Sequence, residues 1–122
     1  MDDKKYFYTW KNFEEDVKEL TSELKRRRPA SGWDGVWGPA RGGLPVAVCL
    51  SHSLNLPFLE KPKSKKTLIV DDIADSGKTL EPFFKKGHTI ATIFYHRHSV
   101  FEPQIWLREK KDEWIVFPWE KI

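Results

Sequence analysis

The feature that most constrains this chain is a short apolar and partly β-branched segment, Thr67–Val70, that ends at two adjacent acids, Asp71 and Asp72. An apolar run of this length, bounded by polar residues, is typical of a strand buried on both faces of a parallel sheet. The two acids then stand where the strand emerges at the carboxyl edge of the sheet, which is where ligands collect in open parallel sheets. We therefore expect an α/β fold with a ligand site beyond this strand.

The segments before and after this strand alternate between patterns typical of strands and patterns typical of helices. Strands are expected at 33–37, 56–59, 67–70 and 89–95, and helices at 10–28, 44–54 and 78–86. The first helix has apolar residues at three- and four-residue steps and Thr9 as its N-cap. Such alternation implies a central parallel sheet with helices on both faces. Two further strand candidates, 105–107 and 114–117, either pair as a hairpin or lie on the sheet edge.

Composition and charge narrow the class of protein. With 122 residues, of which 39% are hydrophobic, the chain is expected to form one domain over residues 1–122 with a packed core. A net charge of +3 spread over scattered basic residues suits an anionic small molecule at least as well as a polynucleotide. One cysteine, Cys49, excludes an internal disulfide, and no apolar run approaches the roughly 18 residues of a membrane span. We expect a cytoplasmic protein.

The loop after the acids has the chemistry of a phosphate site. It reads Asp75-Ser76-Gly77-Lys78-Thr79 and lies just before or at a helix N-terminus, where free backbone N–H groups favour an anion. Hydroxyl donors, a glycine and a lysine add to that preference. Asp71 and Asp72 would repel phosphate, but the vicinal hydroxyls of a ribose and a magnesium shell both want carboxylate acceptors. A ligand that carries both a sugar and a phosphate satisfies the whole segment.

Two other interpretations of this segment are weaker. Gly77-Lys78-Thr79 copies the end of a nucleoside triphosphate loop, but that motif needs glycine where this chain has Asp72, so the triphosphate interpretation is rejected. A strand end with solvated acids and a capped helix explains each feature singly. It does not explain all of them in this order.

The segment from Val70 to Thr79 resembles the signature of the type I phosphoribosyltransferases, which has a hydrophobic strand, two acids, two further residues, Asp-Ser/Thr-Gly and then Thr. The resemblance implies that Asp71 and Asp72 bind the ribose of phosphoribosyl pyrophosphate and also Mg²⁺, directly or through water. It implies that Asp75 is the catalytic acid. The 5′-phosphate would be held by Asp75, Ser76, Gly77, Lys78 and Thr79.

A second loop, Ala40-Arg41-Gly42-Gly43, follows a strand and precedes a helix, so its backbone donors and the Arg41 guanidinium can grip another anion. A plain glycine turn with a solvated arginine is the alternative. The loop resembles the pyrophosphate loop of the same family, which in the 6-oxopurine enzymes usually reads Ser/Ala-Arg-Gly-Gly. Arg41 and Gly42 are the pyrophosphate-binding residues that this resemblance implies.

The tail from Asp112 to Glu120 resembles the C-terminal base-binding segment of microbial xanthine–guanine and hypoxanthine phosphoribosyltransferases. There a Trp stacks on the purine and the backbone of the next residue contacts the ring edge, so Trp114 and Ile115 inherit those roles in a small C-terminal hood. A core aromatic strand is the alternative. The family's purine subgroup commonly has a lysine after the strand expected at 89–95, whereas this chain has His96, which can donate one hydrogen bond to the base.

The chain departs from the family at 60–66. The family normally inserts a long flexible loop before the central strand, which closes over the bound diphosphate, and only Glu60–Lys66 is present here. The first hypothesis is a magnesium-dependent homodimeric enzyme that transfers the phosphoribosyl group to a purine base, with a nucleoside monophosphate as product. The second is a non-catalytic sensor that binds a nucleotide or phosphoribosyl pyrophosphate. A nucleic-acid-binding module is a third, although no recognition motif supports it.

Overall fold

The computed structural model describes residues 4–120. It contains two parallel sheets, a four-stranded one in the order β2-β3-β4-β5 and a two-stranded one that joins β1 to β6. In chain order the elements are β1 (Lys5–Phe7), α1 (Trp10–Arg26), β2 (Gly35–Trp37), α2 (Gly43–Leu54), β3 (Thr67–Ala74), α3 (Glu81–Lys85), β4 (Ile90–Tyr95), β5 (Ile105–Glu109) and β6 (Trp114–Val116). The predicted α/β architecture with a parallel sheet is confirmed.

The central strands β3 and β4 are buried on both faces, as their nearly continuous apolar sequences predict. Strand β3 continues beyond the predicted end at Val70 as far as Ala74, and Asp71 pairs with Thr92 of β4. The prediction that the strand ends at the acids was therefore wrong. The parallel ladder carries the backbone through Asp71 and Asp72, so both acids project from within the strand and not from a loop after it.

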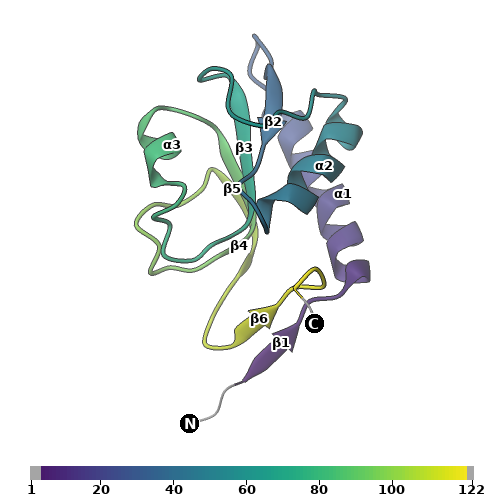
Figure 1. Cartoon of the computed structure of the whole chain (residues 1–122), viewed down its shortest axis with the longest axis vertical. Helices are drawn as coiled ribbons and strands as arrows, with labels where there is room; N and C mark the ends of the chain where they lie inside the picture. The colour runs from purple at the N-terminus through teal and green to yellow at the C-terminus, as the bar shows by residue number, and fades with distance from the viewer. Residues whose placement is uncertain (1–3, 121–122) are drawn as a thin grey trace.

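Helices cover both faces of the main sheet (Figure 1). The larger core lies between the sheet and helices α1 and α2, and the apolar stripe of α1 contributes Phe13, Val17, Leu20 and Leu24 to it. A smaller cluster on the other face packs around Leu80 and Phe101 beside α3. Thr9 caps α1 as predicted, because its hydroxyl oxygen accepts from the Asn12 N–H at 3.0 Å.

The prediction of a strand at 56–59 was wrong, and the helix predicted at 78–86 is shorter than expected. Residues 56–59 make one bridge, between Phe58 and Val36, because Pro57 has no N–H to donate to a ladder. The third helix begins at Glu81 and not at Lys78, since residues 78–80 form a turn after Gly77, whose φ of +82° is left-handed. Among the described residues, no helix has the length and apolarity that crossing a membrane requires.

The tail does not form a hairpin. Strand β5 extends the main sheet as its edge strand, which was the second predicted alternative, but β6 leaves that sheet and pairs with β1. The register matches Lys5 with Trp114 and Phe7 with Val116. This two-stranded sheet, called the hood from here on, contains segments from near both ends of the chain and lies below the main sheet in Figure 1.

A buried polar network joins the hood to the main sheet. The Asp16 carboxylate on α1 is 5% exposed and accepts from the Tyr8 hydroxyl at 2.6 Å and from Arg108 Nε at 2.7 Å. Burial and the bond to Asp16 raise the pKa of Tyr8, so this hydroxyl keeps its proton and remains a donor. Because Tyr8 follows β1 and Arg108 belongs to β5, Asp16 connects three separate elements.

Replacing Asp16 with Ala should destabilise the fold. The change leaves the buried Tyr8 hydroxyl and the Arg108 guanidinium without their acceptor, and since Arg108 is partly exposed we expect a loss of about 2–3 kcal/mol in the free energy of unfolding. The exposed neighbour Glu15→Ala, on the same helix, should change it by less than about 0.5 kcal/mol. Urea unfolding of the two variants measures both values, and equal midpoints would contradict the role of Asp16.

Candidate active site

One open pocket at the carboxyl edge of the main sheet brings together residues of the loop 40–43, the acidic pair and the tail, whereas the loop 75–79 is not part of its lining. It has a volume of about 780 Å³ and lies between β3, the hood and the loop 40–43 before α2, which is called the α2 loop from here on. Its lining residues are Arg41, Gly42, Asp72, Trp114, Trp119 and Glu120. Residues predicted separately for pyrophosphate, ribose and base therefore share one cavity, although they lie far apart in the sequence.

The acidic pair has no cationic partner among the residues that the structure describes. The Asp72 N–H donates to Asp71 Oδ1 at 2.8 Å, and the described ion pairs involve other acids. Burial, and then repulsion from the adjacent Asp72 carboxylate, raise the pKa of Asp71 well above its ordinary value. Burial also raises the pKa of Asp72. Two carboxyl groups with unmet acceptor capacity are poised for hydroxyl donors or a cation.

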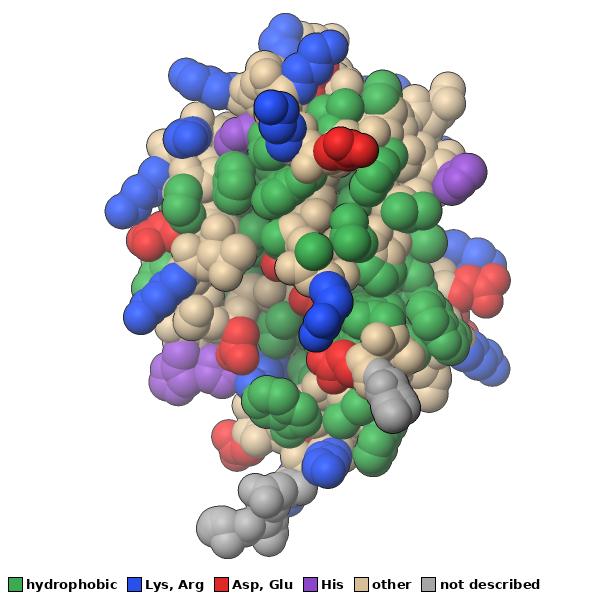
Figure 2. Space-filling view, in the orientation of Figure 1, with side chains coloured by type: hydrophobic (Ala, Val, Ile, Leu, Met, Phe, Trp, Pro, Cys, Tyr) green, Lys and Arg blue, Asp and Glu red, His purple; other side chains and the backbone are tan. Residues whose placement is uncertain are grey.

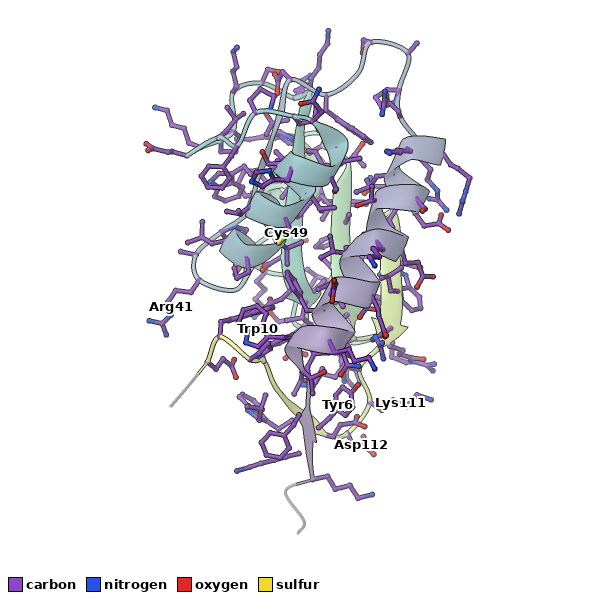
Figure 3. All side chains as sticks on the ribbon, turned by 90° about the vertical axis from the view of Figure 1, so that its right-hand side faces the viewer. Tyr6, Trp10, Arg41, Cys49, Lys111 and Asp112 are labelled. Atoms are coloured by element: carbon purple, nitrogen blue, oxygen red, sulfur yellow. The ribbon has the colours of Figure 1, made fainter. Side chains whose placement is uncertain are left out.

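Gly42 packs directly against this pair. A Cβ built on Gly42 would collide with the carboxylate of Asp72, so only glycine allows the α2 loop to approach the acids this closely. The Arg41 side chain is exposed and extends from the loop away from the body of the protein (Figure 3). The peptide bond between Ala40 and Arg41 is cis. The loop thus presents an exposed guanidinium at the pocket, next to the glycine that contacts Asp72.

The loop 75–79 offers donors to an anion. Its serine, lysine and threonine side chains are exposed, whereas Gly77 is buried against Ser99 and Phe101. No described residue accepts from the N–H of Gly77 or Thr79, so both remain available. Helix α3 has only five residues, and the donors of this site are therefore the loop's own N–H and hydroxyl groups. The Ser76 carbonyl accepts from Val100 N at 2.9 Å and holds the loop in position.

The hood presents an aromatic face and a polar edge. Trp114 is 60% exposed, which is unusual for a tryptophan and leaves room for a flat ligand. In a pair of parallel strands, the backbone N–H and C=O groups of every second residue point toward the partner strand. Here the Trp114 N–H donates to Lys4 O, and the Val116 C=O accepts from Tyr8 N. The N–H and C=O of Ile115 consequently point away from β1. They are suited to contact the edge of a ring stacked on Trp114.

Three residues at the site were missed in the sequence. Trp119 and Glu120 line the pocket, and the Pro-Trp-Glu end of the tail motif was the signal that could have identified them. Lys110 could not be identified, because it lies in the charged run 108–113, in which no pattern distinguishes one lysine from the other. Its Nζ lies 3.2 Å from Asp75 Oδ2 and 5.7 Å from the centroid of the Trp114 ring.

His96 lies apart from this pocket. It follows β4 and, with the turn that ends at His98, borders a separate hollow of about 330 Å³. Its Nδ1 accepts from the His98 N–H at 3.1 Å, and the two imidazole rings lie against each other. The structure therefore does not bring His96 together with Trp114.

The short connection Glu60–Lys66 is bonded to the sheet. The Trp37 indole N–H donates to Glu60 O at 3.0 Å, and Lys63 N donates to Thr67 Oγ1 at 2.9 Å. The Thr67 hydroxyl in turn donates to Asp34 at 2.7 Å. A segment held at both ends in this way has little freedom to close over the pocket.

The acids fit a magnesium ion better than a transition metal. Residues 4–120 contain no group of three or more His, Cys, Asp or Glu placed to hold a metal. Mg²⁺, however, needs only one or two carboxylates when waters and substrate phosphates supply its remaining ligands. Asp71 and Asp72 match that requirement.

Comparison with known proteins agrees with the geometry. No protein-family model matches the chain. The xanthine-guanine phosphoribosyltransferase of Cereibacter sphaeroides is 27% identical, with 97% of this chain and 88% of the relative covered. That of Vibrio parahaemolyticus is 28% identical, with 96% and 90% covered. The first alignment spans 148 positions, more than the 122 residues of this chain, so that relative carries insertions which the chain lacks.

Solved structures match over nearly the whole chain. The purine phosphoribosyltransferase of Pyrococcus horikoshii is 30% identical, with a TM-score of 0.79 over 97% of this chain and 95% of that one. The Helicobacter pylori xanthine-guanine-hypoxanthine phosphoribosyltransferase is 23% identical and shares the fold, with a TM-score of 0.79 over 95% and 93%. The chain belongs to the type I phosphoribosyltransferase family, which confirms the family predicted from the sequence.

Asp71→Asn should stabilise the ligand-free protein at neutral pH. The raised pKa means that the folded state retains a proton which the unfolded chain has released, so stability falls as pH rises from about 4 through the folded pKa. Asparagine removes this loss and keeps the oxygen that accepts from Asp72 N. A gain of about 1 kcal/mol corresponds to roughly 3–5 °C in Tm. Melting curves at pH 4.5 and pH 8 test it: the difference from wild type should grow with pH, and a lower Tm at pH 8 would refute it.

Gly42→Ala should cost about 1–3 kcal/mol of stability, because the new methyl group displaces the Asp72 carboxylate. The cost should largely disappear in an Asp72→Ala background, where nothing remains to collide with it. A double-mutant cycle by chemical denaturation measures the coupling between the two positions. Additive effects would show that the close approach has no energetic consequence. Asp75→Ala, on the same edge but outside the contact, serves as the uncoupled partner.

Proposed function

We propose that this protein is a purine phosphoribosyltransferase, a pentosyltransferase of the glycosyltransferase class. It transfers the phosphoribosyl group of phosphoribosyl pyrophosphate to a 6-oxopurine base, guanine, xanthine or hypoxanthine, and releases pyrophosphate. The observation that carries this proposal is the shared pocket of Arg41, Gly42, Asp72 and Trp114. The four relatives named above, all purine or xanthine-guanine phosphoribosyltransferases, support the same reaction.

The roles of the residues follow from the chemistry of each group. Asp71 and Asp72 accept from the ribose hydroxyls, since their carboxylates lack cationic partners among the described residues. The free N–H groups and hydroxyls of loop 75–79 hold the 5′-phosphate, and Arg41 with the Gly42 backbone holds the pyrophosphate. Trp114 stacks on the purine, and the outward-facing backbone of Ile115 contacts its edge.

The proposed reaction breaks the bond between the ribose C1 and the pyrophosphate oxygen as a nitrogen of the base bonds to the same carbon. Positive charge develops on the sugar, and Asp75, at the carboxyl end of β3, stabilises that charge or accepts the proton of the base. Arg41 stabilises the negative charge on the departing pyrophosphate. Asp71 and Asp72 would hold Mg²⁺, directly or through water, and the bound ion would supply positive charge to offset that of the diphosphate.

We further propose that the protein forms a homodimer and is located in the cytoplasm. The exposed side chains of Leu44 and Val48 lie one turn apart on the outer face of α2, and Figure 2 shows hydrophobic side chains gathered over this region. An apolar patch of this kind suits a contact between subunits. A neighbouring subunit would also shield a pocket that the Glu60–Lys66 connection leaves open.

A non-catalytic sensor of nucleotide or phosphoribosyl pyrophosphate is the second candidate. The observation in its favour is the tethered Glu60–Lys66 connection, because exclusion of water from the diphosphate is part of what a closing loop provides. Such a protein would bind the same ligands through the same residues without turning them over.

A pyrophosphate-release assay with guanine, xanthine and hypoxanthine, in the presence of Mg²⁺, tests the proposed function. Turnover is expected with at least one base, and Asp71→Asn combined with Asp72→Asn should abolish it while the variant remains folded. Thermal stabilisation by phosphoribosyl pyrophosphate without turnover would favour the sensor. The absence of both turnover and stabilisation would exclude both candidates.

A further inference from the structure

A second pocket lies at the end of the molecule opposite the hood. It has a volume of about 420 Å³, within the range of roughly 300–1,000 Å³ that small-molecule sites occupy. It is formed where α1 and α2 end and where the chain enters β2, at the amino edge of the main sheet and the upper end of Figure 1. Its lining includes Lys25, Arg28, Trp33, Leu54, Asn55 and Leu56. None of its residues lines the candidate active site.

One wall of this pocket, which is called the amino-edge pocket from here on, is apolar and continuous with the core. Leu54 is 7% exposed, and Trp33 and Leu56 are partly buried and pack against the larger core cluster. The indole N–H groups that donate to described acceptors are those of Trp37 and Trp106. The amino-edge pocket therefore contains a tryptophan whose ring is partly exposed and whose N–H is available to a ligand.

Hydrogen bonds fix the backbone around the amino-edge pocket. Asn55 ends α2 in the left-handed conformation, with a φ of 56°, and the N–H of Leu56 donates to the Ser51 carbonyl at 3.0 Å. The hydroxyl groups of Thr21 and Ser53 lie 2.7 Å apart and join α1 to α2. The pocket is therefore preformed, and a ligand does not have to order its walls.

Two cations of the basic run 25–28 line the amino-edge pocket, and the other two have partners elsewhere. Arg26 forms an ion pair within α1, and Arg27 donates to a backbone carbonyl at 2.8 Å. No described ion pair involves Lys25 or Arg28, and none of the residues that line the pocket is acidic. The dipole of α1 favours basic residues in its last turn. It does not account for two cations that share a hollow with a tryptophan.

We propose that the amino-edge pocket binds a nucleoside monophosphate, at a site separate from the candidate active site. The flat base packs against Trp33 and the apolar side chains of Leu54 and Leu56, while the phosphate accepts charge-assisted hydrogen bonds from Lys25 and Arg28. A phosphate ion alone leaves the apolar wall uncovered, and an uncharged nucleoside leaves both cations unpaired. This inference does not depend on the proposed function, because the two sites share no residue.

The indole N–H signals of the six tryptophans in a heteronuclear NMR spectrum of the full chain test this site. The variants Trp33→Phe and Trp114→Phe identify the signals that report on the amino-edge pocket and on the active site. Titration with guanosine monophosphate and with adenosine monophosphate should shift the Trp33 signal saturably for at least one of the two. Guanosine, adenosine and inorganic phosphate each supply half of the ligand, so they should reach half-saturation only at concentrations at least about tenfold higher.

Lys25→Ala combined with Arg28→Ala should weaken the binding seen at Trp33 by at least about tenfold, because the phosphate loses both charged donors. Arg26→Ala combined with Arg27→Ala is the matched control. It removes the same charge from the same exposed segment but outside the pocket, and it should change the affinity by less than about twofold. Melting temperatures of both variants verify that they are folded.

The two tryptophan signals separate this inference from the proposed function. The inference is overturned if neither nucleotide shifts the Trp33 signal, if phosphate or the nucleoside alone binds as tightly, or if Lys25→Ala with Arg28→Ala binds as wild type does. Each of these outcomes has that meaning whether or not the Trp114 signal moves. A saturable shift of Trp33 without any shift of Trp114 would support the amino-edge pocket and count against the proposed function.

Discussion

The two carboxyl groups of Asp71 and Asp72 are the constraint around which the pocket is built. They are adjacent on a central strand, they are partly withdrawn from water, and the described structure gives them no cation. Their raised pKa values reflect the unfavourable free energy of burying two adjacent carboxylates. The absence of a side chain at Gly42 and the rigid ladder of β3 both serve to keep that pair within reach of a ligand that supplies hydroxyl groups and positive charge.

The base side of the pocket is built differently. It depends on a small sheet that has little core of its own and is fastened to the main sheet by the Tyr8–Asp16–Arg108 network and by aromatic contacts among Tyr8, Phe94 and Phe117. The acidic pair therefore stands on a central strand of the main sheet, whereas the position of Trp114 relies on a few buried polar bonds and aromatic contacts. Substitutions in the hood can change this part of the pocket without any change to the loops 40–43 and 75–79.

The sequence was most informative where structure is local. The strand, acids and small-residue loop from Val70 to Thr79 form one continuous segment, and its class of ligand could be predicted from residue chemistry alone. The pairing of β1 with β6 could not be predicted, because each strand has only three residues and their partners lie at opposite ends of the sequence. The burial of Lys110 could not be predicted for a related reason, because it arises from tertiary contacts with Asp75 and Trp114. A run of charged residues does not indicate which side chain turns inward.

The parallel pairing of β1 with β6 also determines the order in which the pocket can be completed. Lys5 is synthesised before the main sheet, yet its partner Trp114 is synthesised after the whole of that sheet. A growing chain can therefore assemble the acids and the phosphate loop while the aromatic platform is still missing. Until the tail is synthesised, the apolar faces of Tyr8 and Phe94 lack Phe117 as their cover, and exposed apolar surface of this kind favours aggregation of the nascent chain.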